Sequence, residues 1–167
     1  MQTNTLAPDF SLVDNNGHTH RLSEHLGQVV LVNFWSAECP WSERADQELA
    51  ALINRFPGKL ALLNVASNLN ETGELIAQVI PQRKLDFVLM DNNCELADAW
   101  GAQTTPHVYV IDQSGILRYQ GAIDDVSFRK RIPNRFYVDE AVIALLSGLL
   151  PDTTETSSYG CTIVRNM

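Results

Sequence analysis

The chain has 167 residues, of which 45% are hydrophobic and 19% charged, so it has the size and composition of one globular domain. Its 20 acidic and 12 basic residues give a net charge of −8, which argues against nucleic acid and anionic membranes as main partners. No apolar run approaches the ~20 residues that span a bilayer, and the first residues lack the basic and apolar parts of a signal peptide. We therefore expect a cytoplasmic protein.

Strands and helices are expected to alternate along the chain. The β-branched run 29–35 predicts a strand that is buried on both faces at the centre of a sheet. Apolar residues at helical spacing then predict an amphipathic helix that starts near Cys39 and stops at Pro57-Gly58. The next predicted elements are a strand at 60–66, a helix at 71–82 and a short strand at 87–90.

The remaining pattern predicts a brief helix at 94–100, a hairpin with strands 108–111 and 116–119, and a closing helix at 139–150. This order indicates an α/β fold of three layers, in which helices flank a central mixed sheet. We divide the chain into a domain, 1–150, and a tail, 151–167. The tail is rich in Ser and Thr and lacks periodicity, so we expect it to be mobile or draped over the surface.

The three cysteines, Cys39, Cys94 and Cys161, are too few for a disulfide scaffold and leave at least one free thiol. Cys39 stands at a helix start, where unpaired N–H groups and the helix dipole stabilise a thiolate. Pro40 suits the first helical turn because its missing N–H leaves no bond unmade. Cys39 is therefore the candidate nucleophile, and the alternative is a helix cap that carries an incidental cysteine. Cys94 is expected to be a buried small residue.

Four stretches, in this order, carry a family resemblance: the strand-like 6–12 with the turn 14–20, the strand and elbow at 32–40, the segment 97–106, and the tail residues 160–163. Together they resemble the redoxin branch of the thioredoxin-like superfamily, which includes alkyl hydroperoxide reductases and thiol-specific antioxidant proteins. The resemblance implies a thioredoxin-like sandwich and a cis peptide bond before Pro106. It also implies that the backbone of Thr105 pairs with an extended substrate peptide.

The chain departs from this family at positions that matter for its chemistry. Ser42 replaces the second cysteine of the thioredoxin motif, so its hydroxyl can donate a hydrogen bond to the Cys39 thiolate but cannot release a mixed disulfide. Ser36 fills the hydroxyl position of the peroxiredoxin motif, but Val32 stands where that motif has proline. Thiol–disulfide exchange or slow peroxide reduction is therefore expected rather than efficient peroxidase chemistry.

Cys161 is the expected resolving thiol. Twelve residues beyond Leu149 extend up to ~40 Å, which exceeds the ~15 Å radius of gyration of a compact chain of this length. The matching tail motif of the related proteins points the same way, and the alternative is an unpaired cysteine on a floppy end. Trp41 is expected to lie exposed beside the nucleophile, either as part of a docking surface or as an incidental aromatic residue.

These expectations describe a thiol-dependent oxidoreductase in which Cys39 attacks a disulfide, or is oxidised by a peroxide, and is regenerated by a second thiol. The expected partners are a disulfide-bearing protein or small peroxide and a dithiol reductant such as a thioredoxin. No cofactor is expected because sulfur carries the electrons, and no metal site is expected because the four histidines lack ligand spacing with the cysteines. The alternative is a non-catalytic module that traps cysteine-bearing clients on its Cys39 and Pro106 face.

Overall fold

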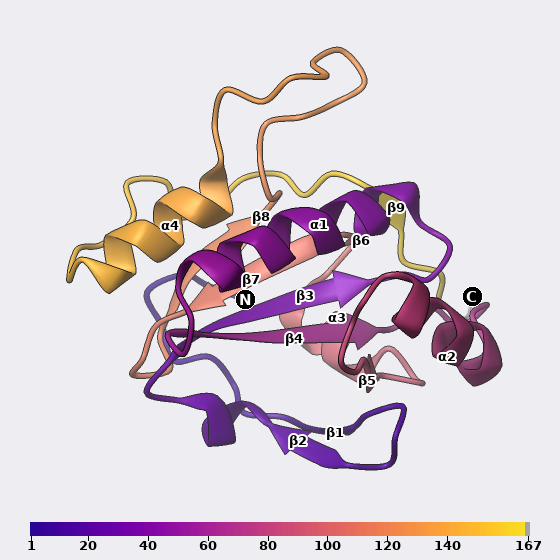
Figure 1. The fold of residues 1–167 in the computed structure, drawn as a ribbon. Helices are drawn as coiled ribbons and strands as arrows, with labels where there is room; N and C mark the ends of the chain where they lie inside the picture. The colour runs from indigo at the N-terminus through magenta and orange to yellow at the C-terminus, as the bar shows by residue number, and fades with distance from the viewer. Residues whose placement is uncertain (166–167) are drawn as a thin grey trace.

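A mixed sheet of five strands forms the centre of the computed structural model, which describes residues 1–165 (Figure 1). Its strand order is β5 (Leu89–Met90), β4 (Leu60–Ala66), β3 (Val29–Trp35), β7 (His107–Ile111) and β8 (Leu117–Gly121). Strand β3 pairs in parallel with β4 and antiparallel with β7, and all seven of its residues are buried. The expected central strand and the expected hairpin of β7 with β8 are thus confirmed.

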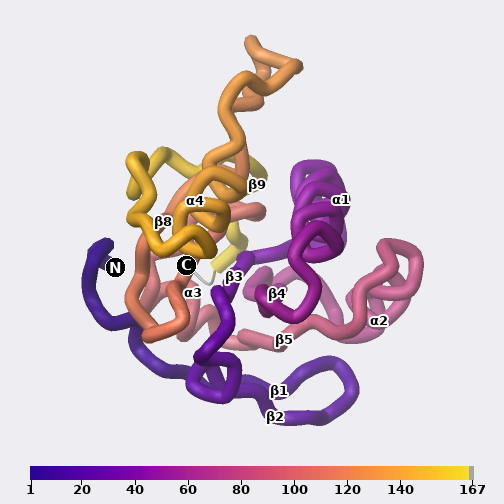
Figure 2. The backbone as a smooth tube through the Cα atoms, turned by 60° about the vertical axis from the view of Figure 1, so that its left-hand side comes forward, coloured from indigo at the N-terminus to yellow at the C-terminus, as the bar shows by residue number. Residues whose placement is uncertain are grey.

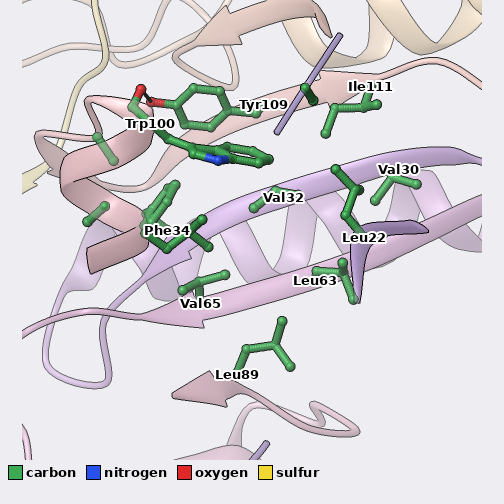
Figure 3. Packing of buried hydrophobic residues seen from close by; sticks show 14 of the residues in the cluster. Leu22, Val30, Val32, Phe34, Leu63, Val65, Leu89, Trp100, Tyr109 and Ile111 are labelled. Carbon is green, nitrogen blue, oxygen red and sulfur yellow. Dashed lines mark hydrogen bonds between the residues drawn. The ribbon is translucent and has the colours of Figure 1, made fainter. Parts of the chain in front are cut away.

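Helices cover both faces of the sheet, as the alternation along β3 requires. Val29 and Leu31 pack with helices α1 (Pro40–Arg55) and α4 (Tyr137–Leu146), and Trp35 packs with α2 (Gly73–Gln82). Val30, Val32 and Phe34 face the opposite side, where α3 (Glu95–Trp100) and the 3-10 helix η1 (Leu22–His25) lie (Figure 3). The three-layer α/β fold is confirmed.

Three buried aromatic rings on the α3 side support the loop that leads to Pro106. Trp100 lies edge-to-face with Phe34 and Tyr109, at centroid distances of 6.5 and 5.2 Å (Figure 3). The Tyr109 hydroxyl also donates to the Trp100 carbonyl oxygen at 3.0 Å. Burial of each of these large rings contributes about 2–3 kcal/mol to stability. The end of α3, and hence the loop after it, is fixed to the sheet.

The closing helix and the N-terminal region differ from the sequence-based expectation. The closing helix α4 begins at Tyr137 and ends at Leu146, before Gly148 adopts a left-handed φ of +75°. The N-terminal region forms a separate hairpin of β1 (Ser11–Val13) and β2 (Thr19–Arg21), so only the end of the expected entry strand is a strand. No described helix is long and apolar enough to cross a membrane.

The tail follows a defined course over the surface. Backbone hydrogen bonds join Gln120 to Thr154 at 3.0 Å and Thr156 to Gln120 at 3.1 Å, so the tail first runs beside β8 (Figure 2). It is packed tightly there, because a Cβ on Gly121 would lie 2.3 Å from the Thr156 Oγ1 atom. The tail then forms β9 (Cys161–Thr162), which pairs antiparallel with β6 (Thr104–Thr105).

Candidate redox site

Cys39 lies where the central strand ends and α1 begins. It occupies the N-cap position, with Pro40 in the first turn, and its residue is only 2% exposed. The Sγ atom lies 2.7 Å from the Cys161 Sγ atom and 3.0 Å from the Thr105 carbonyl oxygen. Two thiols and the backbone before Pro106 therefore meet at one end of β3.

The surroundings of Cys39 favour its thiolate. Burial opposes ionisation, but hydrogen bonds, chiefly those from the Cys161 thiol and from the Ser42 backbone N–H, outweigh it and lower the pKa of Cys39. The buried Thr105 hydroxyl has no hydrogen-bond partner among the described residues. Cys39 is thus the better nucleophile of the pair.

Cys161 has the opposite electrostatic environment. Burial, the hydrogen bond with Cys39 and the negative charges of Cys39 and Glu71 raise the pKa of Cys161 to about 12. Of the reduced pair, Cys39 therefore loses its proton more readily than Cys161. This division of roles suits an attacking sulfur and a reserve thiol that reacts later.

The peptide bond between Thr105 and Pro106 is cis, as the family resemblance implies. The strand before it is occupied by the protein's own tail, because Thr105 pairs with Cys161 and Thr104 with Thr162. The next bond in this ladder joins the Ile163 N–H to the Gln103 carbonyl oxygen at 2.9 Å. The strip that was expected to bind a substrate peptide thus holds an intramolecular one.

The two serines of the motif contribute to the shape of the elbow. The Ser42 hydroxyl accepts a hydrogen bond from the Ser36 N–H at 3.2 Å, and it is the Ser42 backbone N–H that helps to lower the pKa of Cys39. The Ser36 hydroxyl donates to the Glu71 carboxylate. The hydrogen bonds described for these side chains therefore fix the chain around Cys39 rather than engage its sulfur.

Glu71 is a site residue that sequence reasoning missed. Its carboxylate is buried and accepts hydrogen bonds from the Ser36 hydroxyl, the Ala37 N–H at 3.0 Å, the Glu38 N–H at 3.3 Å and the Asn68 side-chain amide at 3.2 Å. We expected Glu71 in the second helix, but α2 begins only at Gly73 after the cap Thr72. An acidic residue at the carboxyl end of a strand parallel to β3 was the available signal.

A second buried network supports the elbow from behind. The Arg83 guanidinium donates to the Ser36 carbonyl oxygen at 3.0 Å and lies 3.4 Å from the Asp46 carboxylate. Asp46 also accepts from the Trp35 indole N–H at 3.0 Å. Burial raises the pKa of Asp46 to about 6, although these two partners act in the opposite direction.

Trp41 contacts the tail beside the nucleophile. Its ring lies edge-to-face with Tyr159 at 4.9 Å and with Phe128 at 6.1 Å. Cys94, in contrast, is buried away from this cluster. Its thiol donates to the Ser67 carbonyl oxygen at 2.7 Å, and burial raises the pKa of Cys94. The structure therefore brings all of the sequence-predicted site residues together: Ser36, Cys39, Pro40, Trp41, Ser42, Thr105, Pro106 and Cys161.

Comparison with solved structures identifies the class of fold. A hypothetical protein from Sinorhizobium meliloti 1021 aligns over 99% of this chain and 96% of its own, with a TM-score of 0.88 and 29% identity. The thioredoxin domain of a thiol-disulfide oxidoreductase from Bacteroides vulgatus aligns over 70% of this chain and 86% of its own, with a TM-score of 0.63 and 21% identity. The fold is thioredoxin-like, as expected.

The family follows from the sequence match. Residues 3–120 match the model of the AhpC/TSA family, so the chain belongs to this family and the redoxin resemblance is confirmed. The thiol-disulfide oxidoreductase ResA of Geobacillus kaustophilus (strain HTA426) is 29% identical over 115 residues, which cover 67% of this chain and 64% of that protein. The chain thus spans about 64% of the length of this curated relative.

Proposed function

We propose that this protein is a thiol-dependent oxidoreductase whose redox couple consists of Cys39 and Cys161. The observation that carries the proposal is the 2.7 Å distance between the two sulfur atoms, which are 122 positions apart in the chain. The lowered pKa of Cys39 and the raised pKa of Cys161 assign them different roles. Membership of the AhpC/TSA family and the relatives named thiol-disulfide oxidoreductases support the same class of reaction.

The reaction with a disulfide has two exchange steps. The Cys39 thiolate attacks one sulfur of the substrate disulfide, forms a mixed disulfide with it and releases the other sulfur as a thiolate. Cys161 then loses its proton and attacks the Cys39 sulfur, which releases the second substrate thiolate. The substrate gains two electrons, and the protein is left with a Cys39–Cys161 disulfide. A dithiol reductant such as a thioredoxin returns both cysteines to the reduced state by the reverse exchange.

The local motif explains why the second thiol must come from the tail. Ser42 occupies the position one helical turn into α1 where a cysteine would resolve the mixed disulfide, and a hydroxyl cannot do so. Cys161 approaches Cys39 from the other side, on the strand that pairs with Thr105. We therefore assign to the tail the step that a second cysteine in the motif would otherwise perform.

A disulfide-bearing protein is the substrate that the site favours. Peroxide is the second candidate, since the family includes peroxide-reducing members. A peroxide would oxidise the Cys39 thiolate to a sulfenic acid, and the Cys161 thiol would then react with this sulfenic acid to form a disulfide and release water. Val32 replaces the motif proline, however, and the Ser36 hydroxyl is engaged by Glu71. The cytoplasmic location and an antioxidant role stay predictions.

A count of released thiols tests the proposal. Reduced protein is mixed with excess dithiobis(nitrobenzoate), a disulfide whose thiolate product absorbs visibly. The wild type should release two product thiolates per Cys39–Cys161 disulfide formed, and Cys161→Ser should release one and retain the other as a mixed disulfide detected by mass. Cys39→Ser, which keeps the tail thiol and the buried Cys94, is the matched control. Release of two product thiolates per molecule of Cys161→Ser would exclude Cys161 from the mechanism.

Turnover then separates the enzyme from the binding module. In a mixture of a disulfide substrate, thioredoxin and its NADPH-dependent reductase, addition of the wild type should lead to consumption of many equivalents of NADPH. The background is the consumption in the same mixture without the protein. Formation of only one stable mixed disulfide per molecule would favour the module that traps clients.

A further inference from the structure

The tail shows how an extended peptide lies on the strip before Pro106. Tyr159, two residues before Cys161, places its ring edge-to-face with Trp41 at 4.9 Å and with Phe128 at 5.6 Å. Its hydroxyl oxygen accepts a hydrogen bond from the Phe128 N–H at 2.9 Å. The side chain at this position is therefore held by two aromatic rings and one backbone donor.

The two rings that receive Tyr159 come from separate elements beside the nucleophile. Trp41 belongs to the first turn of α1, and Phe128 lies on the long loop 122–136 that stands away from the body of the protein (Figures 1 and 2). A small crevice at this point is lined by Trp41, Pro106, Val126 and Tyr159. Phe128 remains 74% exposed although it contacts Tyr159, so most of its apolar side chain is open to a ligand.

Glycine is required at the next position of the peptide. A Cβ atom on Gly160 would lie 2.1 Å from the carbonyl oxygen of Thr105 and 3.0 Å from the Pro106 Cδ atom. The nearest obstacle is backbone of the strip itself, so it cannot turn aside as a flexible side chain would. Any side chain before the cysteine would lift the peptide off the strip.

The residues after Cys161 also make specific contacts with the protein. Ile163 is 2% exposed and packs in the core cluster that contains Trp100. Val164 is bound on the other side, where its carbonyl oxygen accepts from the Leu69 N–H at 3.1 Å and its N–H donates to the Asn68 side chain at 2.8 Å. An apolar side chain two positions after the cysteine therefore has a buried site.

We propose that Trp41 and Phe128 form an aromatic subsite that selects the disulfide-bearing partners of this protein. The preferred partner segment is an extended peptide with an aromatic residue two positions before its cysteine, glycine immediately before it and an apolar residue two positions after it. The tail carries the same pattern and occupies the subsite between encounters. This inference rests on the proposed exchange chemistry at Cys39 and adds the substrate class to it.

Peptide selectivity tests the subsite. The protein is the full chain with Gly160→Ala and Cys161→Ser, which clears the tail from the strip and removes its thiol. The probes are Ser-Tyr-Gly-Cys-Thr-Ile and its variants with Ala for Tyr or Ala for Gly, each as a mixed disulfide with thionitrobenzoate. Cys39 forms a disulfide with the peptide and displaces thionitrobenzoate, whose absorbance gives the rate and whose product is checked by mass.

The Tyr-Gly-Cys peptide should react about ten-fold faster than the variant with Ala for Tyr, because it keeps both edge-to-face contacts. It should also react faster than the variant with Ala for Gly, because the added Cβ would meet the Thr105 carbonyl oxygen. Trp41→Ala or Phe128→Ala in the same protein should abolish the preference for tyrosine and keep the preference for glycine. Equal rates for the three peptides would overturn the subsite and leave the proposed function intact. Failure of all three to react at Cys39 would instead contradict the proposed function.

A second variant keeps the test independent of the double substitution. In the otherwise native chain, Tyr159→Ala should lower the equilibrium constant for forming the Cys39–Cys161 disulfide against glutathione by about ten-fold. Tyr159→Phe, which keeps the ring contacts and loses one hydrogen bond, should retain most of that constant. An unchanged constant in Tyr159→Ala would show that the aromatic contacts do not hold the tail.

Discussion

Formation of the Cys39–Cys161 disulfide should stabilise the folded protein by several kcal/mol. The two residues are 122 positions apart, and closing a loop of that length lowers the entropy of the unfolded chain by an amount worth about 5 kcal/mol at 25 °C. The folded chain already places the two thiols in contact, with their sulfur atoms 2.7 Å apart, so the bond can form without moving the tail from its observed course.

The same quantity sets the reduction potential. The disulfide stabilises the folded state relative to the unfolded state by about 5 kcal/mol. By linkage, the reduction potential of the disulfide should be lower in the folded protein than in the unfolded chain by on the order of 100 mV. A substrate disulfide with a potential above that of the native pair is then reduced, and a stronger dithiol reductant is needed to regenerate the protein.

Urea unfolding measures the effect directly. Oxidised and reduced wild type should differ in unfolding free energy by about 3–5 kcal/mol, with a smaller m-value for the oxidised form because its unfolded chain is more compact. Cys161→Ser, treated in the same way, should show no difference. An oxidised wild type that contains the bridge but is no more stable than the reduced protein would refute the reasoning, because the tail would then have to leave its observed position to pair with Cys39.

Three further predictions concern single groups. Alkylation at pH 6 to 7 should modify Cys39 before Cys94, because only Cys39 has a lowered pKa, and peptide mass mapping that finds Cys94 modified first would overturn the assignment. Glu71→Gln should lower the pKa of Cys161 by removing a nearby negative charge, so site-resolved alkylation of Cys161 should titrate at lower pH than in wild type; an unchanged midpoint would show that Glu71 acts on shape alone. The pKa of Asp46 is about 6 in the folded state and 3.8 in the unfolded state, so the folded state binds the proton more tightly. The protonated Asp46 side chain therefore contributes fully to stability below pH 4, and this contribution is lost as the pH rises to 6. The loss amounts to on the order of 3 kcal/mol, and the difference in unfolding free energy between wild type and Asp46→Asn should therefore change across this range; a constant difference would contradict the raised pKa.

The sheet and its main helix could be predicted from the sequence because their patterns are unambiguous. The runs 29–35 and 60–66 are each apolar apart from one asparagine, and the observed strands β3 and β4 have the same bounds. The end of α4 could not be predicted in this way. Leu149 and Leu150 continue the apolar pattern, but the left-handed backbone of Gly148 ends the helix before them.

The site could be predicted only in part, since local signals exist for some of its residues and not for others. Cys39 was identified from its position between a strand and a helix, and Pro106 from the family resemblance. The pairing of β6 with β9 involves two residues on each strand, which is too short to show a period. The hydrogen bonds that tie Glu71 to the elbow and Tyr159 to Phe128 join residues more than 30 positions apart in the chain, so local sequence patterns do not reveal them.

The disulfide map of the protein after one equivalent of a disulfide oxidant tests the central claim most directly. Reduced wild type is treated with oxidised glutathione, alkylated at low pH, digested and analysed by mass. A Cys39–Cys161 bridge within one chain, with Cys94 alkylated, is the result predicted here. A bridge from Cys39 to Cys94, a bridge between the Cys39 residues of two chains, or stable glutathione on Cys39 beside an alkylated Cys161 would contradict it.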